Sequence, residues 1–77
     1  MSYSNYRIFL RREPEGGYTV TVPALEGCIT YGDDIDSAIK NAKEAIELFI
    51  ETLIELKEPV PSEDGVLEYN LSIENHG

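Results

Sequence analysis

Residues 20–45 read VTVPALEGCITYGDDIDSAIKNAKEA, and this stretch decides the fold. The alternating run before Pro23 predicts a strand that ends there, because proline has no N–H to donate to a β-ladder. Residues 24–27 are expected to turn, and residues 28–31 to form a short third strand. Gly32 then permits a sharp change of direction, because glycine adopts backbone angles that other residues avoid. The stretch therefore predicts two strands that lead directly into a helix.

The helix is predicted to begin after Asp33 or Asp34 and to run to about Leu56. Either aspartate can cap the free N–H groups of the first turn, and Asp36 adds a favourable negative charge there. Apolar residues then recur in steps of three and four, which is the spacing of an amphipathic helix. Pro59 stops the helix, because the residue before a proline avoids the helical conformation.

The flanking segments complete the sheet. Residues 3–12 alternate, with Tyr6 on the apolar face, and residues 18–22 alternate again after a Gly-rich turn at residues 14–17; together they predict an antiparallel hairpin. Residues 66–73 also alternate and predict a fourth strand. The expected architecture is a single α+β domain over residues 1–77, in the order β-β-β-α-β. It has a three- to four-stranded, mostly antiparallel sheet with one long helix on one face.

Composition limits the functional class. The chain has 77 residues, of which 42% are hydrophobic, enough for a packed core but with no run long enough to span a membrane. Cys28 is the single cysteine, so no disulfide can form within the chain. No cluster of metal ligands, phosphate loop or paired nucleophile and base is present. We therefore expect a cytoplasmic protein without metal or cofactor.

The chain is strongly acidic, with 15 acidic residues against 6 basic ones and a net charge of −9. Such a chain repels the nucleic-acid backbone, so direct binding to DNA or RNA is not expected. Two explanations remain open at this point. The charge either serves solubility, or it matches a basic partner and speeds encounter with it.

An ordered set of residues resembles the HicB family of small antitoxin-type proteins. The matching positions are Tyr18, Val20, Val22, Pro23, Leu25, Gly27, Cys28, Thr30, Gly32, Asp33, Ala38, Ala42, Glu44, Ala45, Pro59 and Pro61. They cover nearly the whole chain. Two departures are Glu26, where the family often has a second proline, and the helix cap, where Asp34 and Ser37 replace the family's usual Ser or Thr and Glu.

The resemblance implies a partial RNase H-like fold and a role in binding a protein. HicB proteins occlude HicA, a small basic toxin that cleaves RNA, and this chain is expected to neutralise such a toxin by stoichiometric occlusion. Many HicB proteins carry a C-terminal DNA-binding module. This chain ends at Gly77 without one, so operator binding is not expected to carry over.

Acidic residues are the candidate contacts for that partner. The helix candidates recur every three or four residues along one side, and two more lie near the start of the helix. They are Glu44, Glu47, Glu51 and Glu55, with Asp33 and Asp36 after them. The stripe is either a solvated outer face or a docking surface for a basic protein, since like charges at this spacing mildly oppose the helix.

Two other functions are weighed against the antitoxin. A degenerate metal-dependent RNase H-like nuclease would need an acidic residue on the first strand, and residues 6–11 contain none, so the chain is not expected to be an enzyme. The other alternative is a solitary oligomeric module without a toxin. Leu48, Ile50 and Ile54 lie beside or outside the main apolar stripe, so either the sheet curls around the helix or a second subunit covers them. We expect a homo-oligomer.

Overall fold

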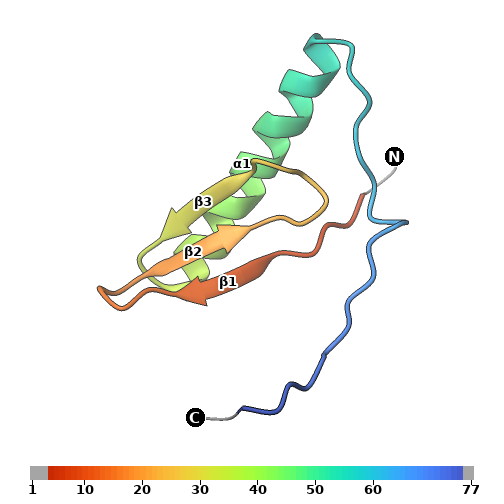
Figure 1. Ribbon diagram of the computed structural model, residues 1–77. Coiled ribbons are helices and arrows are strands. Elements are labelled where there is room, and N and C mark those ends of the chain that lie inside the picture. Colours follow the sequence, from red (N-terminus) through yellow and green to blue (C-terminus); the bar gives the residue numbers. More distant parts are fainter. Residues whose placement is uncertain (1–3, 76–77) are drawn as a thin grey trace.

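The computed structural model describes residues 4–75, and Figure 1 shows a three-stranded sheet with one long helix across one of its faces. Tyr3, where the first predicted strand starts, lies outside the described residues. The elements in chain order are β1 (Phe9–Arg12), β2 (Tyr18–Thr21), β3 (Ile29–Gly32) and α1 (Ile35–Glu55). The strands pair antiparallel in the order β1-β2-β3. The predicted α+β class is therefore confirmed.

The first hairpin forms where two glycines follow a proline. In it, Leu10 of β1 pairs with Val20 of β2. Gly16 and Gly17 both have positive φ, at 103° and 82°, which glycine adopts without steric cost. The N–H of Glu13 donates to the Gly17 carbonyl at 3.0 Å, and the N–H of Gly16 donates back to the Glu13 carbonyl at 3.0 Å. The turn predicted at residues 14–17 is confirmed.

The close packing of β3 on α1 depends on Gly32. This residue is buried, and a Cβ added to it would collide with the backbone of Ser37 and Ala38 in the first turns of the helix. Asn41 reinforces the same junction, because its Nδ2 donates to the Tyr31 carbonyl at 2.7 Å. The glycine therefore provides room for the helix, in addition to the change of direction that the sequence predicts.

The helix starts at an aspartate cap. Asp34 has an extended backbone, and its carboxylate accepts a hydrogen bond from the Ser37 N–H at 2.7 Å. This bond lowers the pKa of the Asp34 carboxyl below its ordinary value, because it favours the charged form. Of the two aspartates that the sequence offers as the cap, Asp34 is the one used.

The helix ends in a left-handed residue. Lys57 has a φ of 58°, a conformation in which glycine is usually found. The N–H of Lys57 donates to the Ile54 carbonyl at 3.0 Å, and the N–H of Glu58 donates to the Leu53 carbonyl at 2.9 Å. This pair of bonds is the Schellman pattern, which satisfies carbonyls that the last turn would leave free.

The core lies between the sheet and the helix, in two clusters. The first consists of Val20, Ala38 and Ala42, with Ile8, Leu10 and Tyr18 packed against it. The second consists of Val22, Leu25 and Cys28, with Tyr6, Ile8, Ala45, Ile46, Phe49 and Ile50 packed against it. The small side chains of Ala38 and Ala42 let the helix lie close to the sheet. Cys28 is buried, and burial raises the pKa of its thiol, as is usual for a cysteine that serves as a small core residue.

The fourth strand predicted at residues 66–73 is wrong for this structure. The segment is almost wholly exposed and pairs with no strand among the described residues. In Figure 1 the chain passes the start of β1 after the helix and then leaves the body of the domain. Alternation predicts an extended segment with one apolar side, but it does not supply the edge to which that segment must pair. The RNase H-like part of the expectation is therefore not confirmed.

No helix within residues 4–75 contains an apolar stretch long enough to cross a lipid bilayer.

Candidate functional site: the acidic face of the helix

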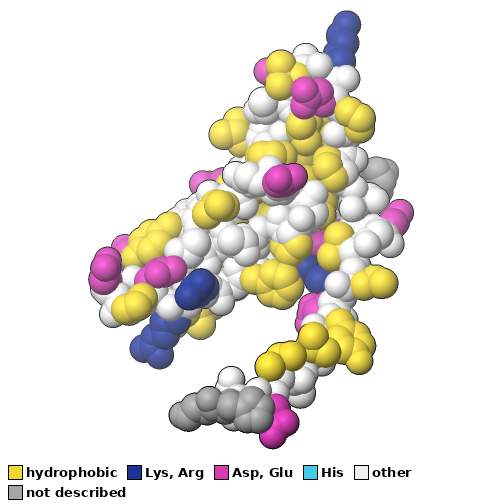
Figure 2. Space-filling model, in the orientation of Figure 1, with side chains coloured by type: hydrophobic (Ala, Val, Ile, Leu, Met, Phe, Trp, Pro, Cys, Tyr) yellow, Lys and Arg dark blue, Asp and Glu magenta, His cyan; other side chains and the backbone are white. Residues whose placement is uncertain are grey.

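The acidic face consists of Glu44, Glu47, Glu51 and Glu55 on α1. All four side chains are exposed. At 3.6 residues per turn they lie on the side of the helix opposite the buried alanines of the core. Figure 2 shows acidic side chains on the visible side of the helix, with hydrophobic side chains between them. The structure therefore brings the four predicted helix contacts together on one surface.

The glutamates of the acidic face make no ion pair among the described residues, and Lys40 and Lys43, one turn before Glu44 and Glu47, are the basic residues nearest to them along the helix. Among residues 4–75, both ion pairs are made by Arg7, and neither includes one of these glutamates. Repulsion between neighbours four residues apart costs about 0.2–0.5 kcal/mol per pair. The helix therefore forms in spite of this surface, because its opposite side buries apolar residues in the core.

Asp33 and Asp36 lie at the other end of the helix. Both are exposed and border a shallow hollow of about 450 Å³ between the hairpin tip and the start of α1, which Arg12 also lines. Asp36 lies on nearly the same side of the helix as Glu47, because eleven residues make close to three turns. Asp33 precedes the helix and belongs to the hollow rather than to the acidic face.

The carboxylates form a charged surface rather than a coordination site. Among the residues that the structure describes, no three His, Cys, Asp or Glu side chains gather closely enough to hold a metal ion. The glutamates of the acidic face are spread over three turns of the helix, which suits contact with several cationic groups of a larger partner.

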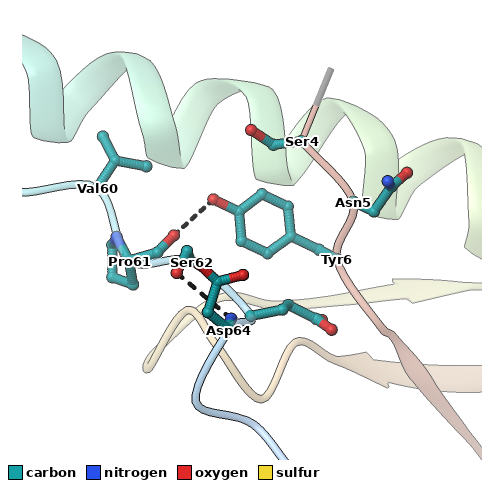
Figure 3. Close-up of a pocket in the computed structure, with 8 residues that line it drawn as sticks. Ser4, Asn5, Tyr6, Val60, Pro61, Ser62 and Asp64 are labelled. Atoms are coloured by element: carbon teal, nitrogen blue, oxygen red, sulfur yellow. Dashed lines mark hydrogen bonds between the residues drawn. The ribbon is translucent and has the colours of Figure 1, made fainter. Parts of the chain in front are cut away.

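A second set of contacts was missed by the sequence reasoning. The hydroxyl of Tyr6 donates a hydrogen bond to the Pro61 carbonyl at 2.7 Å, as Figure 3 shows. Next to it, the backbone N–H of Arg7 donates to a carboxylate oxygen of Glu63, and the Arg7 Nε lies 3.5 Å from the other oxygen. A hollow of about 560 Å³ lies between these two parts of the chain. The only available signal was the Pro-Val-Pro run at residues 59–61, which also marks the end of the helix.

The fold and this surface define a class: a small α+β domain whose helix has an exposed acidic face without ion pairs among the described residues. The chain belongs to the HicB_like antitoxin family of bacterial toxin-antitoxin systems, whose family model matches residues 6–77. The resemblance seen in the sequence is thereby confirmed.

Several proteins are similar to this chain along much of its length. A UPF0150 protein of Synechocystis is 47% identical over 64 residues, which is 83% of this chain and 81% of that protein. A UPF0150 protein of Thermoplasma acidophilum is 39% identical over 60 residues, covering 78% of this chain and 87% of that protein. A 14.9 kDa protein from the rep-hol intergenic region of Haemophilus phage HP1 is 42% identical over 53 residues, only 40% of its length.

Proposed function

We propose that this protein is an antitoxin that neutralises a small, basic, HicA-like toxin, which cleaves RNA, by binding it in a fixed ratio. Membership of the HicB_like antitoxin family supports the antitoxin role and a non-enzymatic one. The kind of toxin and the mode of binding go beyond what family membership supports, and they are our proposal.

One observation carries the proposed mode of binding: the acidic face is exposed and makes no ion pair among the described residues. A protein that cuts RNA must attract phosphates, so its RNA-binding surface is positively charged. A row of carboxylates on a rigid helix offers such a surface an alternative to the phosphate backbone. Because these carboxylates need not break internal ion pairs to bind, their charge is available to the partner.

The mechanism that follows is occlusion. The acidic face of α1 lies over the RNA-binding surface of the toxin and keeps the substrate from its catalytic group. The net charge of −9 speeds the encounter between antitoxin and toxin, an effect that salt weakens. Asp36 extends the contact toward the start of the helix, and Asp33 lies at its margin.

The test is inhibition of RNA cleavage by a HicA-like toxin encoded beside this protein. The wild-type chain is expected to stop cleavage at a fixed molar ratio. A variant with the acidic face neutralised, Glu44→Gln, Glu47→Gln, Glu51→Gln and Glu55→Gln, is expected to require at least about tenfold more protein, a loss of ~1.4 kcal/mol in binding free energy.

The matched control removes the same charge elsewhere. It carries Glu15→Gln, Glu26→Gln, Asp64→Asn and Glu74→Gln, all at exposed positions away from the helix. This control is expected to inhibit almost as well as the wild type. An equal loss of inhibition in both variants would mean that the net charge of the protein, and not the acidic face, binds the toxin.

A further inference from the structure

A largely apolar groove lies between the segment that leads into β1, residues 4–8, and one side of α1. It has a volume of about 590 Å³, and its apolar lining comes from the segment before β1 and from one side of the helix: Tyr6, Ile8, Ile39, Ala42, Ile46 and Ile50. Lys43 and Glu47 also line it. The groove exists because α1 packs chiefly on β3 and β2, which leaves the strip beside β1 uncovered. Within the described chain β1 pairs only with β2, so its outer edge is free.

The same chain exposes a segment with the complementary pattern. Residues 66–75, the C-terminal arm, place a large apolar side chain at every second position from 67 to 73. These side chains are Leu67, Tyr69, Leu71 and Ile73, with exposed fractions of 91%, 85%, 70% and 71%. A row of this kind on one side of an extended segment is typical of a strand that buries one face.

The C-terminal arm and the first strand region also match in length and in charge. Both the stretch 67–73 and the stretch 6–12 span roughly 20 Å when extended. Arg7, Arg11 and Arg12 supply three of the six basic residues of the chain, and they lie on or beside β1. Glu68 lies between Leu67 and Tyr69 of the arm, and Arg7 Nη1 already lies 3.9 Å from Glu68 Oε1.

We propose that the arm of a second copy of this chain occupies the groove beside β1, so that two copies exchange arms. Each arm adds a strand to the free edge of the other sheet and places its apolar row over the groove, and the two-fold relationship buries both arms at once. The arm of the same chain starts next to Arg7 yet leaves the body of the domain and forms no ladder (Figure 1). This proposal does not depend on toxin binding.

The first experiment is sedimentation of the full chain at micromolar concentrations. The wild type is expected to be a dimer, and the variant Tyr69→Asp with Leu71→Asp is expected to be a monomer with unchanged helix content by circular dichroism. The control is Leu48→Asp, at a helix position that is 64% exposed and outside the groove; it is expected to remain a dimer. A monomeric wild type, a dimeric arm variant or a control that dissociates would overturn the proposal.

The second experiment distinguishes exchange from closure of the arm on its own chain. Phe9 and Asn70 are the central residues of the two matching stretches, so they become neighbours whether the strands pair parallel or antiparallel. Phe9→Cys and Asn70→Cys are combined in one chain with Cys28→Ala, and the protein is oxidised. A disulfide between two chains, seen as a doubled mass without reductant, is the expected result. A disulfide within one chain, or none, would refute the exchange.

Discussion

Tyr6 and Pro61 are 55 residues apart in the chain, and the Tyr6 hydroxyl donates a hydrogen bond to the Pro61 carbonyl at 2.7 Å. This bond joins the segment before β1 to the segment that follows the helix. With the Arg7–Glu63 ion pair beside it, it determines where the C-terminal arm leaves the domain. The contact therefore links the packing of the sheet to the surface that we propose for dimerisation.

Removing this hydrogen bond should weaken the domain modestly. Tyr6→Phe keeps the ring, which packs against the second core cluster, and deletes only the hydroxyl. A bond of this kind contributes about 0.5–1.5 kcal/mol to the free energy of unfolding, and we expect a loss in that range by urea denaturation. Ser72→Ala removes an exposed hydroxyl outside the apolar row of the arm; it is the control and should change little. Equal effects in the two variants would contradict the importance of the Pro61 contact.

Gly32 should not tolerate even alanine. The added Cβ would strike helix backbone at Ser37 and Ala38, which cannot move aside as a flexible side chain could. We expect Gly32→Ala to cost about 1–3 kcal/mol of unfolding free energy, measured by thermal or urea denaturation. Gly65→Ala is the matched control, because a Cβ there meets nothing within 4 Å. A Gly32→Ala variant as stable as the control would show that α1 is packed less closely on β3 than described.

The Asp34 cap should make stability depend on pH in the acid range. The bond from the Ser37 N–H lowers the pKa of Asp34 in the folded state, so its contribution is present above the unfolded pKa of about 3.9. That contribution is lost as the pH falls through the lower, folded value. Asp34→Asn keeps a capping oxygen without a titrating group. Between pH 5 and acid conditions, about pH 2, the wild type should therefore lose more in melting temperature than Asp34→Asn does.

Replacing the left-handed residue at the end of α1 should stabilise the protein. Lys57 has a φ of 58°, which costs an L-residue roughly 1–2 kcal/mol, whereas glycine adopts it freely but loses more chain entropy on folding. Lys57→Gly is expected to raise the free energy of unfolding by about 0.5–1 kcal/mol. Lys57→Ala removes the charge without relieving the backbone and should not stabilise. Stabilisation by both would point to the charge instead.

Local features of the fold were predictable from sequence, and distant ones were not. The spacing of apolar residues along α1, the aspartates before it and the glycines of the hairpin act within a few residues, and all appear where expected. The bond from Tyr6 to Pro61 joins segments that no local pattern relates. The alternation at residues 66–73 predicted a fourth strand, but strand pairing depends on a distant edge, and the structure leaves this segment unpaired.

In the candidate site, too, local features could be predicted from the sequence and distant ones could not. Helical periodicity was enough to place Glu44, Glu47, Glu51 and Glu55 on one exposed face. It could not show that Asp33 lies apart from that face, because the turn between β3 and α1 sets its position. The groove beside β1 could not be predicted from the sequence either, because it arises from how the helix is placed across the three strands.

The most direct test of the central claim is a calorimetric titration of this protein with a HicA-like toxin at low and high salt. We predict saturation at a fixed ratio, weaker binding at high salt, and at least about tenfold weaker binding when the four glutamates of the acidic face become glutamine. The variant with four exposed acids neutralised elsewhere should bind nearly as the wild type does. Affinity that is unchanged by removal of the acidic face would contradict the account.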